Sequence, residues 1–141
     1  MKAKLQWNND ISFSGITSTG YEIKIDGSEE MGGKNAGSRP MEILLYSLAG
    51  CTGIYFISIL QKMRLKPTNF FIELNGHRAE IEPKPFTKID IHYILEGNVP
   101  KGKLERAITL THEKYCSVAH TLHSTFAISY TLNGENKVAY L

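Results

Sequence analysis

The longest run of apolar positions lies between Ser38 and Pro67, and it predicts a buried helix over about residues 39–65. Ser38 suits the position before a helix, and Pro40 fits the first turn, where its missing N–H costs nothing. Apolar side chains then occur on every side: Ile43, Leu44, Leu45, Leu48, Ile54, Phe56, Ile57, Ile59 and Leu60. A helix that is apolar all round must be enclosed. Polar and small residues interrupt the run too often for a membrane span, so protein is the predicted enclosure.

Patterns typical of strands lie on both sides of this helix. Before it, short apolar alternations predict an antiparallel meander of three strands, over residues 2–8, 11–14 and 21–26. A polar, glycine-rich loop over residues 27–37 leads into the helix. After it, we expect two strands around a turn at Asn75-Gly76 (69–74 and 78–81), a strand over 86–95, a helix over 103–115, a short helix after Cys116 and a strand over 126–132.

This order of elements predicts an α+β fold in a single domain over residues 1–141. The domain consists of N-terminal strands (1–26), the central helix, and C-terminal strands and helices (69–141). One sheet can cover only one side of a helix that is apolar all round. We therefore expect a homodimer in which two intertwined chains enclose their long helices between antiparallel sheets.

The composition of the chain argues against several classes of function. The chain has 141 residues and a net charge of +2, which does not indicate a nucleic-acid or anionic-membrane partner. The N-terminal sequence turns polar at once, so no secretion signal is expected. Two cysteines in a chain of this length do not make a disulfide scaffold. We expect a cytoplasmic protein whose two thiols are either inert core residues or redox-active.

The two cysteines occupy different local settings. Cys51 lies about three turns inside the predicted helix, beyond the reach of the helix dipole, so a thiolate there needs another source of stabilisation. Cys116 lies where one helix ends and a shorter one begins, near free N–H groups that favour a thiolate. Packing as a small hydrophobic residue is the alternative for either cysteine.

Two motifs together resemble a known family. The segment SRPMEILLYSLAGCTGIYFISIL resembles the central-helix signature of the OsmC-like family, which includes osmotically inducible protein C and the organic hydroperoxide resistance proteins. The segment KYCSVAHTL resembles the downstream cysteine motif of the same family, and the two cysteines lie 65 residues apart. With HRAEIEPKPFTKIDIHY, the chain is most similar to the YhfA-like branch. The resemblance covers nearly the whole chain and implies an intertwined dimer.

The resemblance also implies a chemistry. In the peroxidase members, the helix cysteine attacks an organic hydroperoxide and becomes a sulfenic acid, and the downstream cysteine then forms a disulfide that a dithiol reductant reopens. By position, Cys51 is the peroxidatic and Cys116 the resolving cysteine, and no cofactor is implied. The expected apolar pocket consists of Leu44, Leu48, Tyr55, Phe56 and aromatic residues of the partner chain.

One position departs from the peroxidase pattern. The peroxidases pair an arginine with a glutamate ten positions before the helix cysteine, where this chain has Met41. Glu42 is adjacent, but nine residues of helix place it about 180° from Cys51. The candidate arginines are Arg39 and Arg78, each of which is otherwise a solvated surface charge. We therefore expect hydroperoxide reduction to be slow.

Two other interpretations remain open. His112, Cys116, His120 and His123 have a spacing that would align on a helix and could bind zinc, although the predicted break at Cys116 argues against it. A dimeric binding protein without catalysis is the second alternative, with a small apolar ligand in its enclosed cavity. Reaction with a hydroperoxide distinguishes this alternative from the peroxidase.

Overall fold

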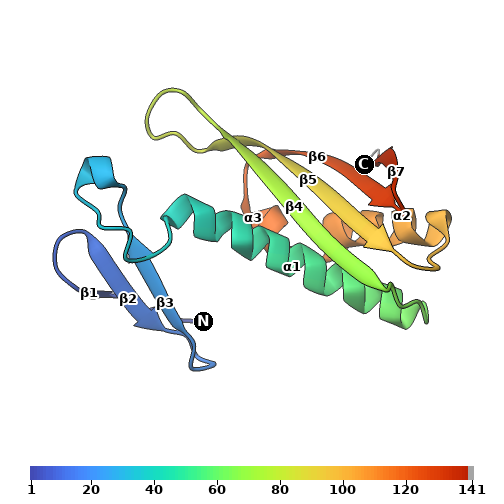
Figure 1. Cartoon of the computed structure of the whole chain (residues 1–141), viewed down its shortest axis with the longest axis horizontal. Coiled ribbons are helices and arrows are strands. Elements are labelled where there is room, and N and C mark those ends of the chain that lie inside the picture. Colours follow the sequence, from blue (N-terminus) through green and yellow to red (C-terminus); the bar gives the residue numbers. More distant parts are fainter. Residues whose placement is uncertain (140–141) are drawn as a thin grey trace. The chain divides into compact units, whose positions relative to one another are not determined.

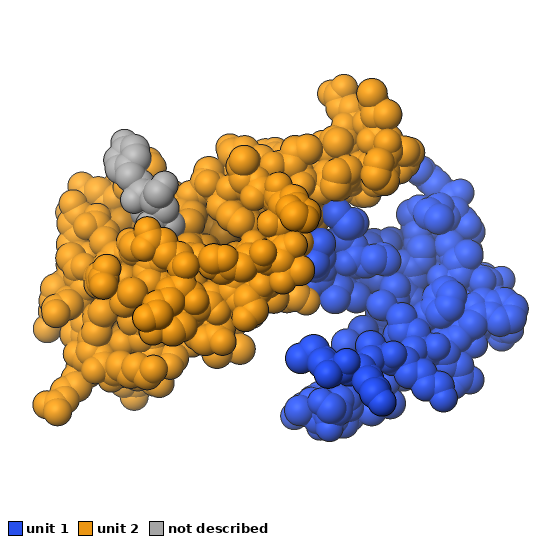
Figure 2. Space-filling view, turned by 180° about the vertical axis from the view of Figure 1, so that it is seen from behind, with its two compact units in different colours: residues 1–46 blue, residues 47–141 orange. Residues whose placement is uncertain are grey.

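The computed structural model describes residues 1–139, and these form two compact units (Figures 1 and 2). The smaller unit comprises residues 1–46, and the larger unit begins at Ser47. The boundary falls inside the long helix α1 (Pro40–Lys62), so each unit contains part of it. The mixture of strands and helices confirms the predicted α+β class.

The smaller unit contains the predicted antiparallel meander. Its three strands pair in the order β1–β2–β3 and span Gln6–Trp7, Ser12–Ile16 and Glu22–Asp26. A short 3₁₀ turn, η1 (Glu29–Met31), lies in the glycine-rich loop that follows.

Asp26 anchors that loop. Its Oδ1 accepts a hydrogen bond from the Gly27 N–H (2.8 Å), and its Oδ2 accepts from the N–H groups of Lys34 (2.9 Å) and Ala36 (3.0 Å). The amides of Ala36 and Lys34 hold the pKa of this carboxyl below its usual range, with a smaller contribution from the charge of Arg39. The buried carboxylate therefore ties both ends of the loop to the end of β3.

We expect Asp26→Asn to loosen this loop at neutral pH, because an amide replaces one of the two accepting oxygens. The pKa of Asp26 is lower in the folded chain, so its stabilising effect is complete above the ordinary carboxyl pKa of about 3.9 and disappears as pH falls through the lowered value. Hydrogen exchange at Lys34 and Ala36 should therefore be faster in the variant at pH 7, with the difference shrinking in acid.

The control for Asp26 is Asp10→Asn. Asp10 forms an exposed ion pair with Lys34 (2.8 Å), and exposed pairs contribute about 0–1 kcal/mol. This variant should leave the exchange at Ala36 nearly unchanged. Equal exchange in Asp26→Asn and the unsubstituted protein at pH 7 would show that the carboxylate does not hold the loop.

The larger unit contains a four-stranded sheet in the order β4–β5–β6–β7. Its strands are Asn69–Arg78, Phe86–Glu96, Thr125–Leu132 and Glu135–Ala139. All pairs are antiparallel except β5–β6, which is parallel. A parallel pair needs a long crossover, and here it consists of α2 (Lys101–Leu110), a π-helical turn η2 (Thr111–Tyr115) and α3 (Ser117–Thr121).

The turn predicted at Asn75-Gly76 is wrong, because β4 continues straight through it to Arg78. Gly76 is paired with Ile89 on β5, and the ring of Phe86 lies over it. A Cβ atom at Gly76 would come within 2.4 Å of that ring. Glycine is therefore needed at this position because an aromatic ring packs directly on the strand backbone. Close approach of this kind is one of the known reasons for a glycine inside a strand.

Helix α1 ends three residues earlier than the predicted range. Arg64 adopts a left-handed conformation (φ 58°), and the Leu65 N–H donates back to the Leu60 carbonyl at 2.9 Å, a common way for a helix to stop. The apolar residues Met63 and Leu65 continue the sequence pattern beyond this end, which is why the pattern alone extends the helix too far.

Only one stripe of α1 is buried, formed by Leu48, Thr52, Phe56, Ile59 and Leu60. Phe56 packs against Phe70 of β4 and Tyr93 of β5, with ring centroids 5.1 and 4.9 Å apart. Helix α1 is long and apolar enough to cross a membrane, a test that core helices of soluble proteins also pass, yet just 28% of its apolar window is buried. Much of its apolar surface is thus open in a single chain.

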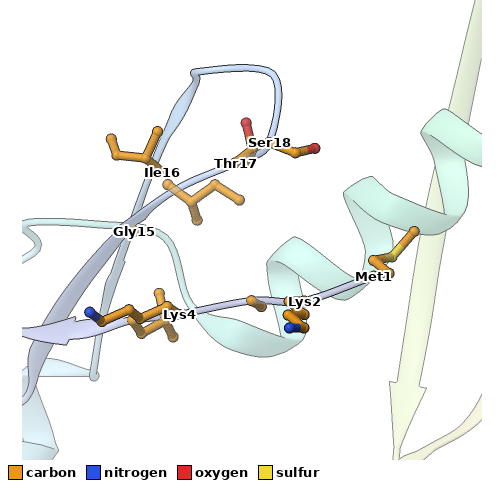
Figure 3. Close-up of a pocket in the computed structure, with 10 residues that line it drawn as sticks. Met1, Lys2, Lys4, Gly15, Ile16, Thr17 and Ser18 are labelled. Atoms are coloured by element: carbon orange, nitrogen blue, oxygen red, sulfur yellow. The ribbon is translucent and has the colours of Figure 1, made fainter.

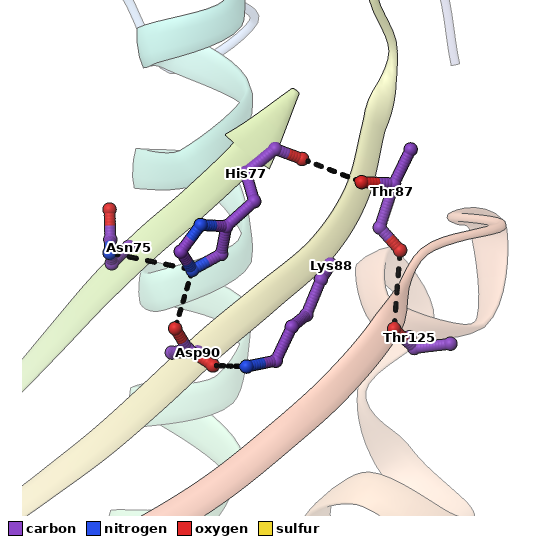
Figure 4. Close-up of polar contacts among 6 residues, drawn as sticks. All are labelled: Asn75, His77, Thr87, Lys88, Asp90 and Thr125. Atoms are coloured by element: carbon purple, nitrogen blue, oxygen red, sulfur yellow. Dashed lines mark hydrogen bonds and ion pairs between the residues drawn. The ribbon is translucent and has the colours of Figure 1, made fainter. Parts of the chain in front are cut away.

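The opposite face of the four-stranded sheet is polar (Figure 4). His77 and Lys88 both contact Asp90, with N–O distances of 2.6 and 2.7 Å. The Lys88 ammonium and, next, the His77 ring hold the pKa of Asp90 below its usual range. These three ionisable groups of the face are paired with one another, whereas much of the apolar surface of α1 is uncovered.

Candidate functional site

The π-helical turn places Cys116 at the junction of two helices. The Cys116 N–H donates to the Thr111 carbonyl at 2.8 Å, which closes the wide turn, and the backbone of Cys116 then becomes extended. Helix α3 starts at the next residue. The predicted helix break at Cys116 is confirmed, and π-helical turns occur frequently at functional sites.

Cys116 is fully buried and lies against α1. Its Sγ is 3.3 Å from the Oγ1 of Thr52, the residue that follows Cys51 in the chain. Cys51 itself is half-buried, and it is close enough to Cys116 to raise the pKa of that thiol. The fold thus brings two cysteines from distant parts of the sequence into one site, both as free thiols.

Burial raises the pKa of the Cys116 thiol, and the neighbouring Cys51 raises it further. The Thr52 hydroxyl and, next, the backbone N–H of Ala119 in α3 act in the opposite direction. The sequence predicted that helix-start N–H groups would favour a thiolate here. The backbone N–H of Ala119 does favour the thiolate, but desolvation of the sulfur has the larger effect on the pKa. Cys116 is therefore mostly a neutral thiol at neutral pH.

A tyrosine and a histidine lie next to the thiol pair. Burial raises the pKa of Tyr93, as does the charge of Cys116, which places these two groups within electrostatic range of each other. The Tyr93 hydroxyl is 2.7 Å from Nε2 of His112. Burial, with a smaller effect of His120, lowers the pKa of His112 to about 4, so at neutral pH the ring is neutral and accepts a hydrogen bond from the Tyr93 hydroxyl.

The histidines that suggested zinc have other contacts. Nε2 of His120 lies 2.9 Å from the His112 carbonyl, and Nδ1 of His112 is buried without a partner among residues 1–139. In that part of the chain, no three histidine, cysteine or acidic side chains come together in a way that could hold a metal ion.

The predicted pocket residues fall into two groups. Leu48 and Phe56 are completely buried in the core of the larger unit. Leu44 is half-buried in the smaller unit. Tyr55, one turn after Cys51, stacks on Tyr115 with ring centroids 5.8 Å apart, and Tyr115 directly precedes Cys116. This tyrosine pair is therefore the apolar surface that connects the two cysteine-bearing segments.

The candidate thiolate partners have contacts of their own. Arg78 donates to the Lys84 carbonyl at 2.7 Å, and Arg39 donates to the carbonyls of Asp26 (3.4 Å) and Gly37 (3.3 Å) and to Asn35. Glu42 accepts a long hydrogen bond from the Arg39 backbone N–H (3.4 Å). Within residues 1–139, the polar contacts of these three side chains are to loop and backbone groups, and none is to a thiol.

A separate hollow of about 470 Å³ lies in the smaller unit, between residues 1–5 and the residues of β2 and its turn (Figure 3). Its lining includes Met1, Leu5, Ile16 and Ile23 and contains no cysteine, histidine or acidic residue. This hollow therefore offers apolar surface to be covered, and it offers none of the groups that the cysteine chemistry needs.

Sequence reasoning did not identify Thr52, Tyr93 or the relation of either to Cys116. One signal existed for Thr52, since a hydroxyl in a helix predicted to be buried needs a hydrogen-bond partner. The partner comes from a segment 64 residues away, and no local pattern names it. Tyr93 is equally typical of a strand core, so its sequence context does not distinguish packing from function.

Comparisons with known proteins agree with one another. Residues 32–131 match the family model described as OsmC-like protein. Protein YhfA of Escherichia coli is 36% identical over 132 residues, which cover 93% of this chain and 96% of YhfA. A solved structure of a hypothetical protein from Aquifex aeolicus is 34% identical, with a TM-score of 0.82 over 93% of this chain and 94% of that one.

A more distant structure carries a functional name. The organic hydroperoxide resistance protein OsmC from Legionella pneumophila has a TM-score of 0.67 and 14% identity, with 93% of this chain and 94% of that chain covered. At this identity the likeness shows the fold alone. The identity to YhfA agrees with the branch that the sequence motifs indicated.

Proposed function

Because this chain belongs to the OsmC-like family, we propose that it reduces organic hydroperoxides with thiols, through Cys51 as the peroxidatic and Cys116 as the resolving cysteine. The observation that carries the proposal is the proximity of the two thiols: Cys51 is close enough to raise the pKa of Cys116, and Cys116 Sγ lies 3.3 Å from Oγ1 of Thr52, the residue next to Cys51. A disulfide forms only between cysteines that lie close together. The family relationship supports a redox role, and the roles of the two cysteines are our inference.

The proposed cycle has three steps. The Cys51 thiolate attacks the distal peroxide oxygen and the O–O bond breaks, so that Cys51 becomes a sulfenic acid and the leaving alkoxide takes a proton from solvent to become the alcohol. The Cys116 thiol then displaces that oxygen, which leaves as water as the S–S bond forms. A dithiol reductant reopens the disulfide by thiol–disulfide exchange and is itself oxidised to a disulfide.

We propose that the first step is slow in this protein. A thiolate inside a helix loses hydration and needs a nearby cation to offset the loss. Met41 occupies the position of the peroxidase glutamate, and the contacts of Arg39 and Arg78 are to loop groups. Among residues 1–139, neither arginine is held beside a thiol by an acidic side chain.

We also propose that the working form is a cytoplasmic homodimer. The reason is the exposed apolar surface of α1, where Ile54 is 71% exposed in the middle of the helix. A second chain would cover this surface and supply further apolar residues around Cys51. Exposed apolar areas of this kind commonly mark protein–protein interfaces.

The proposed function can be tested with one oxidant and one mass measurement. The reduced protein is treated with one equivalent of cumene hydroperoxide and its intact mass is recorded without added thiol. We expect each chain to lose two hydrogen atoms, because a disulfide replaces two thiols. An unchanged mass, with both thiols still free, would contradict the peroxidase and favour a binding protein with an enclosed apolar cavity.

A further inference from the structure

We infer that Thr52 is a positioning residue for the resolving step, whose hydroxyl holds the sulfur of Cys116 beside Cys51 and donates a hydrogen bond to the attacking sulfur. This inference rests on the proposed function for its place in the reaction. Its structural basis, the contact between Thr52 and Cys116, lies within one compact unit and is independent of any partner chain.

The first support is the burial of both groups. Thr52 and Cys116 are completely buried, and Oγ1 and Sγ are 3.3 Å apart. A buried hydroxyl without a partner costs about 1–3 kcal/mol, so this contact is the one that satisfies Thr52 among the described residues. Threonine is stiff at χ1 and divides between two rotamers in a helix, and the contact with Cys116 favours the one that directs the hydroxyl at the sulfur.

The second support is the position of Thr52 in the chain. It follows Cys51 directly on α1, so any movement of the Cys51 backbone moves Thr52 with it. The hydrogen bond joins this short segment to the residue at the start of α3. The contact therefore fixes the distance between the two reacting sulfurs more directly than packing elsewhere in the core.

The third support concerns charge. Formation of the disulfide requires the Cys116 sulfur to give up its proton as it attacks the Cys51 sulfenic acid, and water leaves. The surroundings oppose this: the site is buried, and the neighbouring Cys51 of α1 also raises the pKa of Cys116, while Cys116 in turn raises the pKa of Tyr93 of β5. Thr52 and the Ala119 amide are the groups that favour the thiolate.

The experiment compares Thr52→Val, which keeps the shape and removes the hydroxyl, with Thr52→Ser, which restores it. Each reduced variant receives one equivalent of cumene hydroperoxide, and quenched samples are analysed by intact mass. In Thr52→Val we expect the species with one added oxygen to accumulate and disulfide formation to be slower by roughly fivefold to tenfold. Thr52→Ser should restore most of the rate, and the rate of Cys51 oxidation serves as the reference in each variant.

A second measurement does not require the peroxidase reaction. In the Cys51→Ser background, the ultraviolet absorbance of the Cys116 thiolate is titrated against pH, with the variant lacking both cysteines as the blank. Thr52→Val should shift the titration of Cys116 to higher pH, and Thr52→Ser should return it. If hydroperoxide never oxidises Cys51 but this shift occurs, the proposed function fails while the contact of Thr52 with the Cys116 thiolate stands. An unchanged titration, or equal disulfide rates in the valine and threonine proteins, would overturn the inference.

Discussion

Cys51→Ser is expected to abolish the turnover of an organic hydroperoxide with a dithiol reductant, because serine is not ionised at neutral pH and cannot take its place as a nucleophile. Cys116→Ser is expected to permit the first oxidation and then to stop at the sulfenic acid of Cys51. Consumption of cumene hydroperoxide, followed together with intact mass, distinguishes the two variants: the first consumes none, and the second consumes one equivalent per chain when no reductant is present.

The pair of variants also provides its own control. Both replace one sulfur by oxygen in the same site, so general damage to the site would affect them alike. The opposite assignment of roles would reverse the result, with Cys116→Ser losing the first oxidation. Full turnover in Cys51→Ser would contradict the two-cysteine mechanism altogether.

Ile54→Lys is expected to prevent dimerisation and with it stable folding. In the single chain Ile54 is 71% exposed, so a lysine would be harmless if the protein worked as a monomer. In the proposed dimer the charge would enter an apolar interface, and burying an unpaired charge costs several kcal/mol, a large share of the about 5–15 kcal/mol stability of a small protein. Light scattering and circular dichroism of the purified variant would measure the two effects.

The matched control is Phe71→Lys. Phe71 is also exposed (58%), but it lies on the polar outer face of the four-stranded sheet, opposite Ile94 of β5. The same new charge there should leave the dimer intact and change the stability by about 0.5 kcal/mol or less. If Ile54→Lys is as stable as Phe71→Lys and has the same mass in solution, the dimer proposal is wrong.

Much of the fold follows from local patterns in the sequence. The continuous apolar run predicts α1, the short alternations predict β2 and β3, and the break before Ser117 follows from the change in pattern around Cys116. These features are determined by residues that are close together in the sequence, so they can be predicted from one sequence alone.

One strand, β7, was missed, and one turn, at Asn75-Gly76, was predicted where there is none. Asn133 and Gly134 both adopt left-handed conformations and lead into β7, which pairs with β6. An Asn-Gly pair after a strand is a strong hairpin signal, and the sequence reasoning did not extend the last strand through it. At Asn75-Gly76 the same signal was misleading, because a ring from β5 covers the glycine. Only the tertiary contact distinguishes the two cases.

The two cysteines of the candidate site were predictable from the sequence, but Thr52 and Tyr93 beside them, and the chemistry of the site, were not. The motifs around Cys51 and Cys116 identify both cysteines, but the effect of the surroundings on Cys116 depends on burial and on Thr52, Ala119 and Cys51 together. Desolvation of the sulfur arises from the whole core. The prediction from the helix start gave the right direction for the effect of the Ala119 N–H on the pKa of Cys116, but it missed the larger effect of burial.

The burial of Cys116 also bears on how the cycle is reset. A reductant arriving from solution meets Cys51, which is half-buried, before the fully buried Cys116. Attack on the Cys51 sulfur makes Cys116 the leaving group, and a thiolate of raised pKa leaves slowly. In the proposed cycle Thr52 would also donate its hydrogen bond to the departing sulfur, and the dependence of turnover on dithiol concentration would reveal whether this recycling step limits the proposed turnover.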